Sequence, residues 1–146
     1  MAEARASLTI VIARPIAEVF AFMVDYRNNP KWQEGLLAVE QPDHPPHVGA
    51  KISTTRKVMG RTTTSVIRIT EYADERVIRS RTDSGPVDYE GGYRFETAGD
   101  EGTRVVYEGT ITTGRFMGPV GRLLAKGFQR QMDGNLKALK RLLEDQ

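Results

Sequence analysis

Apolar positions follow two different spacings along this chain, and the changes between them divide it into three parts. In the first part, residues 7–13 (SLTIVIA) are rich in β-branched side chains and predict a strand. Pro15 then fits the first position of a helix, because an N–H at that position would have no hydrogen-bond partner within the helix. Apolar residues spaced along one helical face follow over 16–23, which predicts a helix ending near Tyr26.

The segment NNPKWQEG, residues 28–35, predicts at most one further short helix. Asn28 or Asn29 would cap this helix, with Pro30 as its first residue. The segment also contains Trp32, the only tryptophan of the chain. So large an aromatic side chain on a short segment predicts one of two roles: it fills the core beneath the helices, or it forms one wall of a ligand cavity.

From Leu36 to Thr112 the spacing changes to alternation, broken by turn sequences such as PDHPPHVG, DSGP and AGDEG. No helical stretch separates these turns, which favours an antiparallel meander over strand–helix–strand units. The predicted strands span residues 36–42, 50–58, 62–73, 76–82, 88–97 and 103–112.

The third part, residues 119–143, returns to helical spacing, with Pro119 in the first turn. One half of its helical wheel is apolar, and a helix of about 25 residues is roughly 37 Å long, which is enough to cover the sheet. Asn135 falls inside the apolar half and Gln131 at its edge. A buried amide without a partner costs about 1–3 kcal/mol. Each therefore predicts either a bond to strand backbone or trapped water, or a group that orients a ligand.

This order of elements predicts an α+β fold: a seven-stranded curved antiparallel sheet wrapped around a long C-terminal helix, with two shorter helices between strands 1 and 2. The stretches that carry the pattern are ARPIAEVFAFMVDYRNNPKW, VIRITEYADERVIRSRTDSGP and AGDEGTRVVYEGTI. Through them the chain resembles, over nearly its whole length, the START-like (helix-grip) superfamily, particularly the polyketide cyclase/dehydrase and lipid-transport (SRPBCC) family. The resemblance implies a ligand cavity and no particular catalytic residue.

Every second turn of a meander lies at the same end of the sheet, which groups the connections 58–61, 84–87 and 113–119. All three carry apolar residues at or beside their tips, where polar residues are usual. We therefore expect these loops to rim a pocket between the sheet and the long helix, and the resemblance implies an opening at the same end. The candidate ligand contacts are Trp32, Met59, Tyr89, Tyr93, Tyr107, Phe116, Met117, Phe128, Gln131 and Asn135.

Three of these candidates, Tyr89, Tyr93 and Tyr107, depend on which way their strands face. Alternation can aim each ring inward with its hydroxyl available to a ligand, and each ring can equally belong to the core or the surface. The sequence EGGY, residues 90–93, favours a β-bulge, which would reverse the facing of the residues beyond it.

Composition changes this picture mainly by exclusion. The chain has 146 residues, which predicts a single domain over 1–146, and a net charge of +2 gives no reason to expect a nucleic-acid partner. It has no cysteine, which excludes disulfides and thiolate chemistry, and no apolar run approaches the roughly 18 residues of a membrane span. We expect a cytoplasmic protein, monomeric or homodimeric, whose partner is a hydrophobic small-molecule ligand.

Few residues suggest catalysis or metal binding. His44 and His47 have a metal-like spacing, but the two prolines between them favour a stiff turn, so neither a metal nor another cofactor is predicted. Both histidines lie at the end opposite the expected pocket, which leaves the catalytic residues unassigned. Any proton transfer would need a tyrosine or a carboxylate near the mouth, and the carboxylates considered are Asp25, Glu34, Asp88 and Glu90.

Three functions remain open from the sequence. The leading hypothesis is that the cavity binds or carries a hydrophobic small molecule such as a lipid, a polyketide or an isoprenoid-like compound. An alternative is an enzyme of the polyketide cyclase/dehydratase type, using acid–base chemistry in the same cavity. A second alternative is a module that contacts a partner protein or a membrane. Arg56, Lys57 and Arg61 around an apolar turn would suit an anionic headgroup or a ligand carboxylate, or they form a solvated hairpin.

Overall fold

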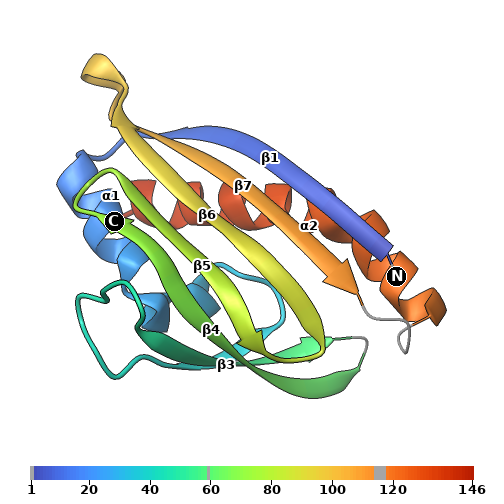
Figure 1. The fold of residues 1–146 in the computed structure, drawn as a ribbon. Helices are drawn as coiled ribbons and strands as arrows, with labels where there is room; N and C mark the ends of the chain where they lie inside the picture. The colour runs from blue at the N-terminus through green and yellow to red at the C-terminus, as the bar shows by residue number, and fades with distance from the viewer. Residues whose placement is uncertain (1, 59, 114–117) are drawn as a thin grey trace.

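The computed structural model describes residues 2–58, 60–113 and 118–146. One sheet of seven antiparallel strands curves around a long helix, with a short α-helix and a 3₁₀ helix between the first two strands (Figure 1). The predicted α+β helix-grip architecture is therefore confirmed. The elements in chain order are β1 (Ala2–Ile12), α1 (Ile16–Val24), the 3₁₀ helix η1 (Tyr26–Lys31), β2 (Leu36–Glu40), β3 (Lys51–Val58), β4 (Arg61–Ala73), β5 (Val77–Ser84), β6 (Val87–Thr97), the 3₁₀ helix η2 (Gly99–Glu101), β7 (Thr103–Thr113) and α2 (Gly118–Glu144).

The strand order is β1-β7-β6-β5-β4-β3-β2, so β1 pairs with the last strand and the rest of the sheet is a meander. β1 pairs with β7 from Ala2 opposite Thr113 to Ile12 opposite Thr103. This pairing explains why β1 begins earlier than the predicted 7–13, since backbone bonds to β7 hold its more polar first half. The turns after β3 and β5 lie at the end of the sheet where α2 begins, and the turns after β4 and β6 lie at the other end (Figure 1).

The starts of the two short helices differ from the predictions. Pro15 precedes α1 as its N-cap instead of occupying its first position. Asp25 caps η1, because its Oδ1 accepts the backbone N–H of Arg27 at 3.2 Å. The predicted cap at Asn28 or Asn29 is wrong, and the helix begins before its predicted first residue. A carboxylate further upstream already satisfies the first free N–H group.

The β-bulge predicted at residues 90–93 is absent from the pairing of β6. The register with β7 continues unbroken along β6, with Gly91 directly opposite Gly109. These glycines permit close approach, because a Cβ at Gly91 would lie 2.6 Å from the carbonyl oxygen of Glu108. The alternation of β6 is therefore regular, which decides which of its side chains face α2.

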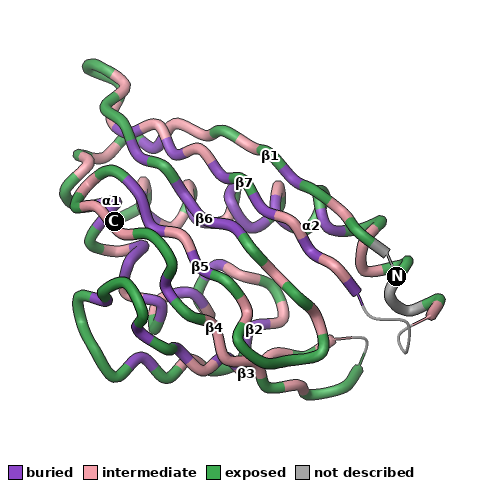
Figure 2. The backbone as a smooth tube through the Cα atoms, viewed as in Figure 1, coloured by how far each residue is buried: buried purple, intermediate pink, exposed green. Residues whose placement is uncertain are grey.

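The core lies between the concave face of the sheet and the two α-helices. Buried positions alternate along β7, and buried and exposed segments also alternate along α2 (Figure 2). The predicted apolar half of the long helix is buried from its middle onward, at Phe128, Met132, Leu136, Leu139 and Leu143. Among the residues of α2 whose burial is described, none before Phe128 is buried, so the first turns lie outside the core. No described helix combines the length and apolar content of a membrane span.

Candidate functional site

A cavity of about 840 Å³ lies between the concave face of the sheet and α2. This volume falls within the range of about 300–1,000 Å³ typical of sites for small organic ligands. Side chains of the central strands and of the segment between η1 and β2 form the other walls. The turns after β4 and β6 lie at the end of the sheet away from the start of α2 (Figure 1), and they contribute none of the described lining. The cavity therefore lies toward the other end, where the loop pattern predicts a pocket.

Two of the three predicted tyrosines line the cavity. Tyr89 and Tyr93 face it from β6, whereas Tyr107 on β7 is fully buried and does not reach the lining. The hydroxyl oxygens of Tyr89 and Tyr107 lie 3.0 Å apart, and the ring centroids of Tyr93 and Tyr107 are 5.1 Å apart. The opposed Gly91 and Gly109 make room for this arrangement, since a Cβ at Gly109 would collide with the Tyr107 hydroxyl. The tyrosines thus form a packed layer on the sheet.

Burial raises the pKa of Tyr89, Tyr93 and Tyr107 above the usual value for a phenol. Loss of hydration disfavours the ionised form, so all three phenols stay protonated at neutral pH. Tyr26, which lines the cavity from η1, has a raised pKa for the same reason. A protonated phenol is a hydrogen-bond donor and a poor base, so these groups suit contacts with a ligand oxygen.

Arg56 extends from β3 into the same cavity, whereas the sequence left open whether it contacts an anionic group or belongs to a solvated hairpin. Its side chain is half-buried, and no carboxylate pairs with it among the residues that the structure describes. Burial lowers the pKa of the guanidinium, and the neighbouring Tyr89 and Tyr93 oppose that change. Alternation along the strand indicates this inward orientation of Arg56. Ile52 and Thr54 precede it at alternate positions of β3 and are buried on the same face.

Both polar residues predicted on the buried side of the long helix line the cavity. Asn135 is 4% exposed, and its Oδ1 accepts the backbone N–H of Glu34 at 3.0 Å. This bond ties α2 to the segment that precedes β2, where strand backbone was the expected partner. Gln131 lines the cavity with an exposed side chain, and Phe128 is buried one turn earlier. Asn135 therefore holds the wall together, while the amide of Gln131 has no hydrogen-bond partner among the described residues.

Trp32 packs in the core behind the cavity and is not part of its lining. It is 4% exposed, and its ring meets that of Tyr93 edge-on, with 6.3 Å between centroids. Its indole N–H has no hydrogen-bond partner among the described residues. The structure thus favours the core role for Trp32. Three further candidates, Met59, Phe116 and Met117, lie outside the described residues.

Two lining residues on η1 are missing from the candidates chosen by sequence. Asn29 is 6% exposed, and its Oδ1 has no hydrogen-bond partner in the described part of the chain. Tyr26 lies three residues earlier and also lines the cavity, as does Ser80. Residues three apart share one face of a 3₁₀ helix, which brings Tyr26 and Asn29 to the cavity together. Interpreting Asn29 as a helix cap concealed this role.

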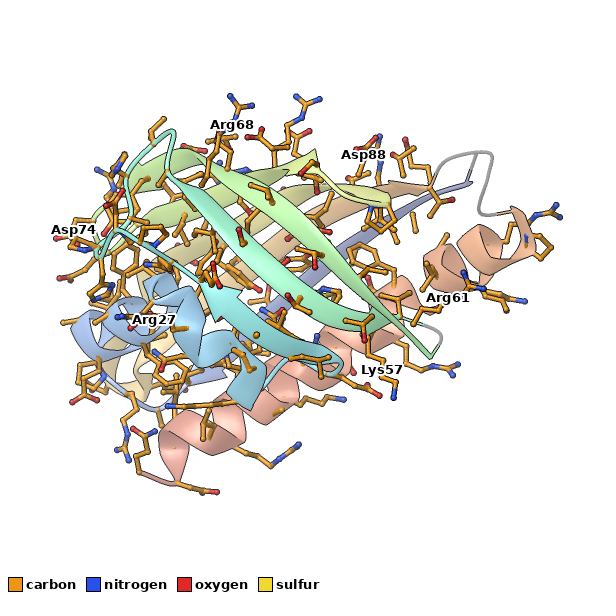
Figure 3. All side chains as sticks on the ribbon, turned by 90° about the horizontal axis from the view of Figure 1, so that it is seen from below. Arg27, Lys57, Arg61, Arg68, Asp74 and Asp88 are labelled. Atoms are coloured by element: carbon orange, nitrogen blue, oxygen red, sulfur yellow. The ribbon has the colours of Figure 1, made fainter. Side chains whose placement is uncertain are left out.

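Of the four carboxylates considered for proton transfer, Glu34 lines the cavity. Asp25 pairs with Arg27 at 2.7 Å, and hydrogen bonds from Arg27 hold the pKa of the Asp25 carboxyl below its usual value. Asp88 and Glu90 are exposed on β6, and Figure 3 shows Asp88 on the side of the sheet away from α2. Glu34 is therefore the member of this set within reach of a bound molecule.

The histidine pair lies in an exposed loop between β2 and β3. His47 Nε2 lies 3.0 Å from Asp43 Oδ2. Hydrogen bonds with the Val48 carbonyl and with Asp43 raise the pKa of the His47 imidazole. Within residues 2–58, 60–113 and 118–146, no group of three or more histidines, cysteines or carboxylates is placed to hold a metal ion. The loop is an exposed turn in which His47 contacts Asp43, at the end opposite the cavity.

Known proteins share the sequence pattern and the fold of this chain. Residues 3–144 match the sequence profile of a family described as polyketide cyclase / dehydrase and lipid transport. A search of curated proteins by sequence found no match. The Zhui aromatase/cyclase from Streptomyces sp. R1128 has a similar structure, with a TM-score of 0.80, 20% identity, and 98% of this chain and 94% of that chain covered.

Two other solved structures extend the likeness. A START superfamily protein from Mycobacterium smegmatis has a TM-score of 0.79 at 14% identity, with 97% of each chain covered. The di-domain ARO/CYC StfQ from the steffimycin biosynthetic pathway has a TM-score of 0.75 at 13% identity. In that comparison 98% of this chain and 52% of StfQ are covered. At these identities the likeness establishes the fold.

Proposed function

The chain belongs to the polyketide cyclase/dehydrase and lipid transport family, and on this premise we propose that it binds and carries a hydrophobic small molecule in the cavity beneath α2. The ligand is a lipid, a polyketide or an isoprenoid-like compound with at least one polar oxygen group. The proposal includes a cytoplasmic location and a monomeric or homodimeric state, which cell fractionation and light scattering test.

The observation that carries this proposal is Arg56 in the cavity wall, which has no carboxylate partner among the described residues. Withdrawing a cation from water is costly unless a partner replaces the lost hydration. A guanidinium offers paired N–H donors to a carboxylate or to another oxygen group. A ligand with its polar end at Arg56 supplies that partner, while its apolar body packs against Phe128 and Ile111.

The remaining contacts follow from the geometry of the lining. Tyr89 and Tyr93 present phenols that donate hydrogen bonds, and Gln131 and Asn29 present amides. Asn135 contributes mainly by holding the wall, because its acceptor is already used by Glu34. Trp32 and Tyr107 support the tyrosine layer from behind. We propose that the ligand site consists of these two tyrosines and two amides, together with Arg56 and Phe128.

Native mass spectrometry of freshly purified protein, followed by extraction of any bound compound, tests this function. We expect a stoichiometric apolar compound on the wild type and on Arg81→Met, and a loss of at least about tenfold in bound compound for Arg56→Met. Arg81 is a matched control because Ser80 and Thr82 line the cavity, so the residue between them on β5 faces the outside. An equal ligand content in all three proteins would remove Arg56 from the site.

A second candidate function is an enzyme of the cyclase/dehydratase type, favoured by the donors around Arg56 and by the fold shared with an aromatase/cyclase. Arg56 and the Tyr89 phenol would stabilise an enolate oxygen of a poly-β-ketone chain. Glu34 would remove the proton from the attacking carbon, and as that carbon bonds to a carbonyl carbon the carbonyl oxygen becomes an alkoxide that takes up the proton from Glu34. The resulting hydroxyl then leaves as water together with a proton from the neighbouring carbon. Incubation with a poly-β-ketone analogue distinguishes the two functions: recovery of the unchanged compound supports a carrier, and a product that has lost water supports the enzyme.

A further inference from the structure

We propose that the end of the molecule at which β3 meets β4 and α2 begins is a docking surface for an anionic lipid bilayer. The surface consists of five exposed basic side chains and one exposed leucine, hereafter the basic rim: Lys57, Arg61, Arg122, Leu123, Lys126 and Arg130. This inference goes beyond ligand binding and holds whatever compound the cavity takes.

Charge is the first observation behind the proposal. None of the five basic side chains of the rim forms an ion pair with another described residue. By contrast, Lys51 and Arg68 on the sheet share Asp83. In the sequence, the rim residues lie within stretches free of acidic residues, since neither 44–70 nor 109–132 includes an aspartate or glutamate. A chain of net charge +2 therefore concentrates unpaired positive charge at one end.

The rim borders the cavity from both the sheet and the long helix. Lys57 from β3 and Arg130 from α2 are both part of the cavity lining, so the charges of the rim border the space that would hold a ligand. Lys57 and Arg61 project from the end of the β3–β4 hairpin beside α2, and Arg27 and Asp74 lie toward the opposite end (Figure 3). Glu34 is part of the cavity lining, and Asp88 lies on the outer side of β6. Asp133 follows Arg130 by one turn of α2 and pairs with Lys137 at 2.9 Å.

The start of α2 supplies the second observation. Arg122, Lys126 and Arg130 recur every four residues and so form one stripe along the helix. Leu123 is 57% exposed and lies beside this stripe, on the side of Leu124 and the cavity. A helical segment with basic side chains flanking an exposed apolar one fits the boundary between headgroups and acyl chains.

A bilayer fits the rim better than an acidic protein does. The rim combines a broad positive field with an exposed leucine next to an apolar cavity, and a bilayer combines anionic headgroups with a hydrocarbon interior. A compound leaving the cavity at this end would pass into hydrocarbon without crossing water. An acidic protein would match the charge alone, and it is treated as an alternative outcome of the test.

Co-sedimentation with vesicles tests the docking surface. We expect the wild type to bind vesicles of phosphatidylcholine with phosphatidylglycerol and not vesicles of phosphatidylcholine alone. Raising the salt concentration from 0.1 M to 1 M should abolish binding, since it shortens the screening length from about 10 Å to about 3 Å. The double variant Arg122→Glu/Lys126→Glu should weaken binding by at least about tenfold, and Leu123→Ser should weaken it severalfold at constant charge.

The matched control is Arg81→Glu/Arg94→Glu, which makes the same change of charge at exposed positions on the sheet. We expect it to keep vesicle binding within about twofold of the wild type. Neither Arg122 nor Lys126 lines the cavity, so the rim variant should keep its extractable ligand, which separates failure of docking from failure of ligand binding. Equal losses in both double variants, or no binding of the wild type to anionic vesicles, would overturn the proposal. Salt-sensitive capture of an acidic protein without vesicle binding would likewise overturn it in favour of a protein partner.

Discussion

The hydroxyl oxygens of Tyr89 and Tyr107 lie 3.0 Å apart on neighbouring strands, although the two residues are not opposite each other in the register. Tyr89 is paired with Ile111, and Tyr107 with Tyr93. The hydroxyls meet because Gly91 and Gly109 occupy the positions between them and leave the surface of the sheet bare. The hydrogen bond satisfies a fully buried phenol and keeps the Tyr89 hydroxyl at the cavity wall.

Raising the pH above about 10 should destabilise the fold through these tyrosines. The pKa of each buried phenol is higher in the folded state than in the unfolded state, so the folded state holds the proton more tightly. The stabilisation is complete below the unfolded pKa and is lost as the pH rises toward the folded pKa. Urea unfolding across this range should show a falling free energy, with tyrosinate absorbance appearing together with unfolding. Ionisation of the five tyrosines near pH 10 in the still-folded protein would contradict this.

Glycines of α2 and of the sheet should respond in opposite directions to alanine. A Cβ at Gly127 or Gly134 would meet nothing within 4 Å, so Gly127→Ala and Gly134→Ala should each raise the free energy of unfolding by about 0.5–1 kcal/mol. A Cβ at Gly91 would lie 2.7 Å from the Cα of Gly109, so Gly91→Ala should lower it by about 1–3 kcal/mol. Urea titration of the three variants provides the comparison.

The same glycines give a test of cavity volume. Gly127 and Gly134 line the cavity, so a leucine at Gly127 would project into space available to a ligand. Gly127→Leu should keep the fold and reduce the amount of large apolar compound recovered by extraction, whereas Gly127→Ala should reduce it less. Full recovery from the leucine variant would show that ligands do not use this part of the cavity.

Truncating Trp32 should be among the most damaging single changes. The side chain is 4% exposed and contacts the Tyr93 ring, so Trp32→Ala would leave a large void in the core. We expect a loss of about 3–5 kcal/mol in the free energy of unfolding, measured by urea titration. Trp32→Phe retains an aromatic ring and has no N–H to satisfy, and it should cost clearly less. A negligible effect of the alanine variant would contradict the core role.

Changing Asn135 separates its structural role from any role in binding. Asn135→Leu removes the acceptor for the Glu34 N–H, which should cost about 1–3 kcal/mol of unfolding free energy. Asn135→Asp keeps an acceptor for the Glu34 N–H, so the loss of unfolding free energy from that hydrogen bond should be smaller than in Asn135→Leu. The aspartate does place a charge in a buried site. Thermal unfolding of both variants, paired with ligand extraction, gives the readout. Unchanged stability of the leucine variant would show that the bond contributes little.

Local pattern was sufficient for most of the fold. The strands from β2 to β7 and the buried face of α2 follow from spacing alone, because each element must place its apolar side chains on one face. The errors fell where local signals compete. Asn29 looked like a helix cap and EGGY like a bulge, and in both cases a partner distant in sequence decided otherwise: the cavity face of η1 for Asn29, and the close approach of β7 for Gly91.

The sequence by itself determined which residues form strands and helices, which face of α2 is buried, and at which end of the sheet the cavity lies. These properties depend on the period of the backbone and on the order of turns. Only the tertiary structure decided that Arg56 enters the cavity with no carboxylate partner in the described part of the chain, and that the acceptor of Asn135 is already occupied. Whether a polar group is free depends on what other segments bring within about 3 Å of it, and that proximity is a property of the packed chain.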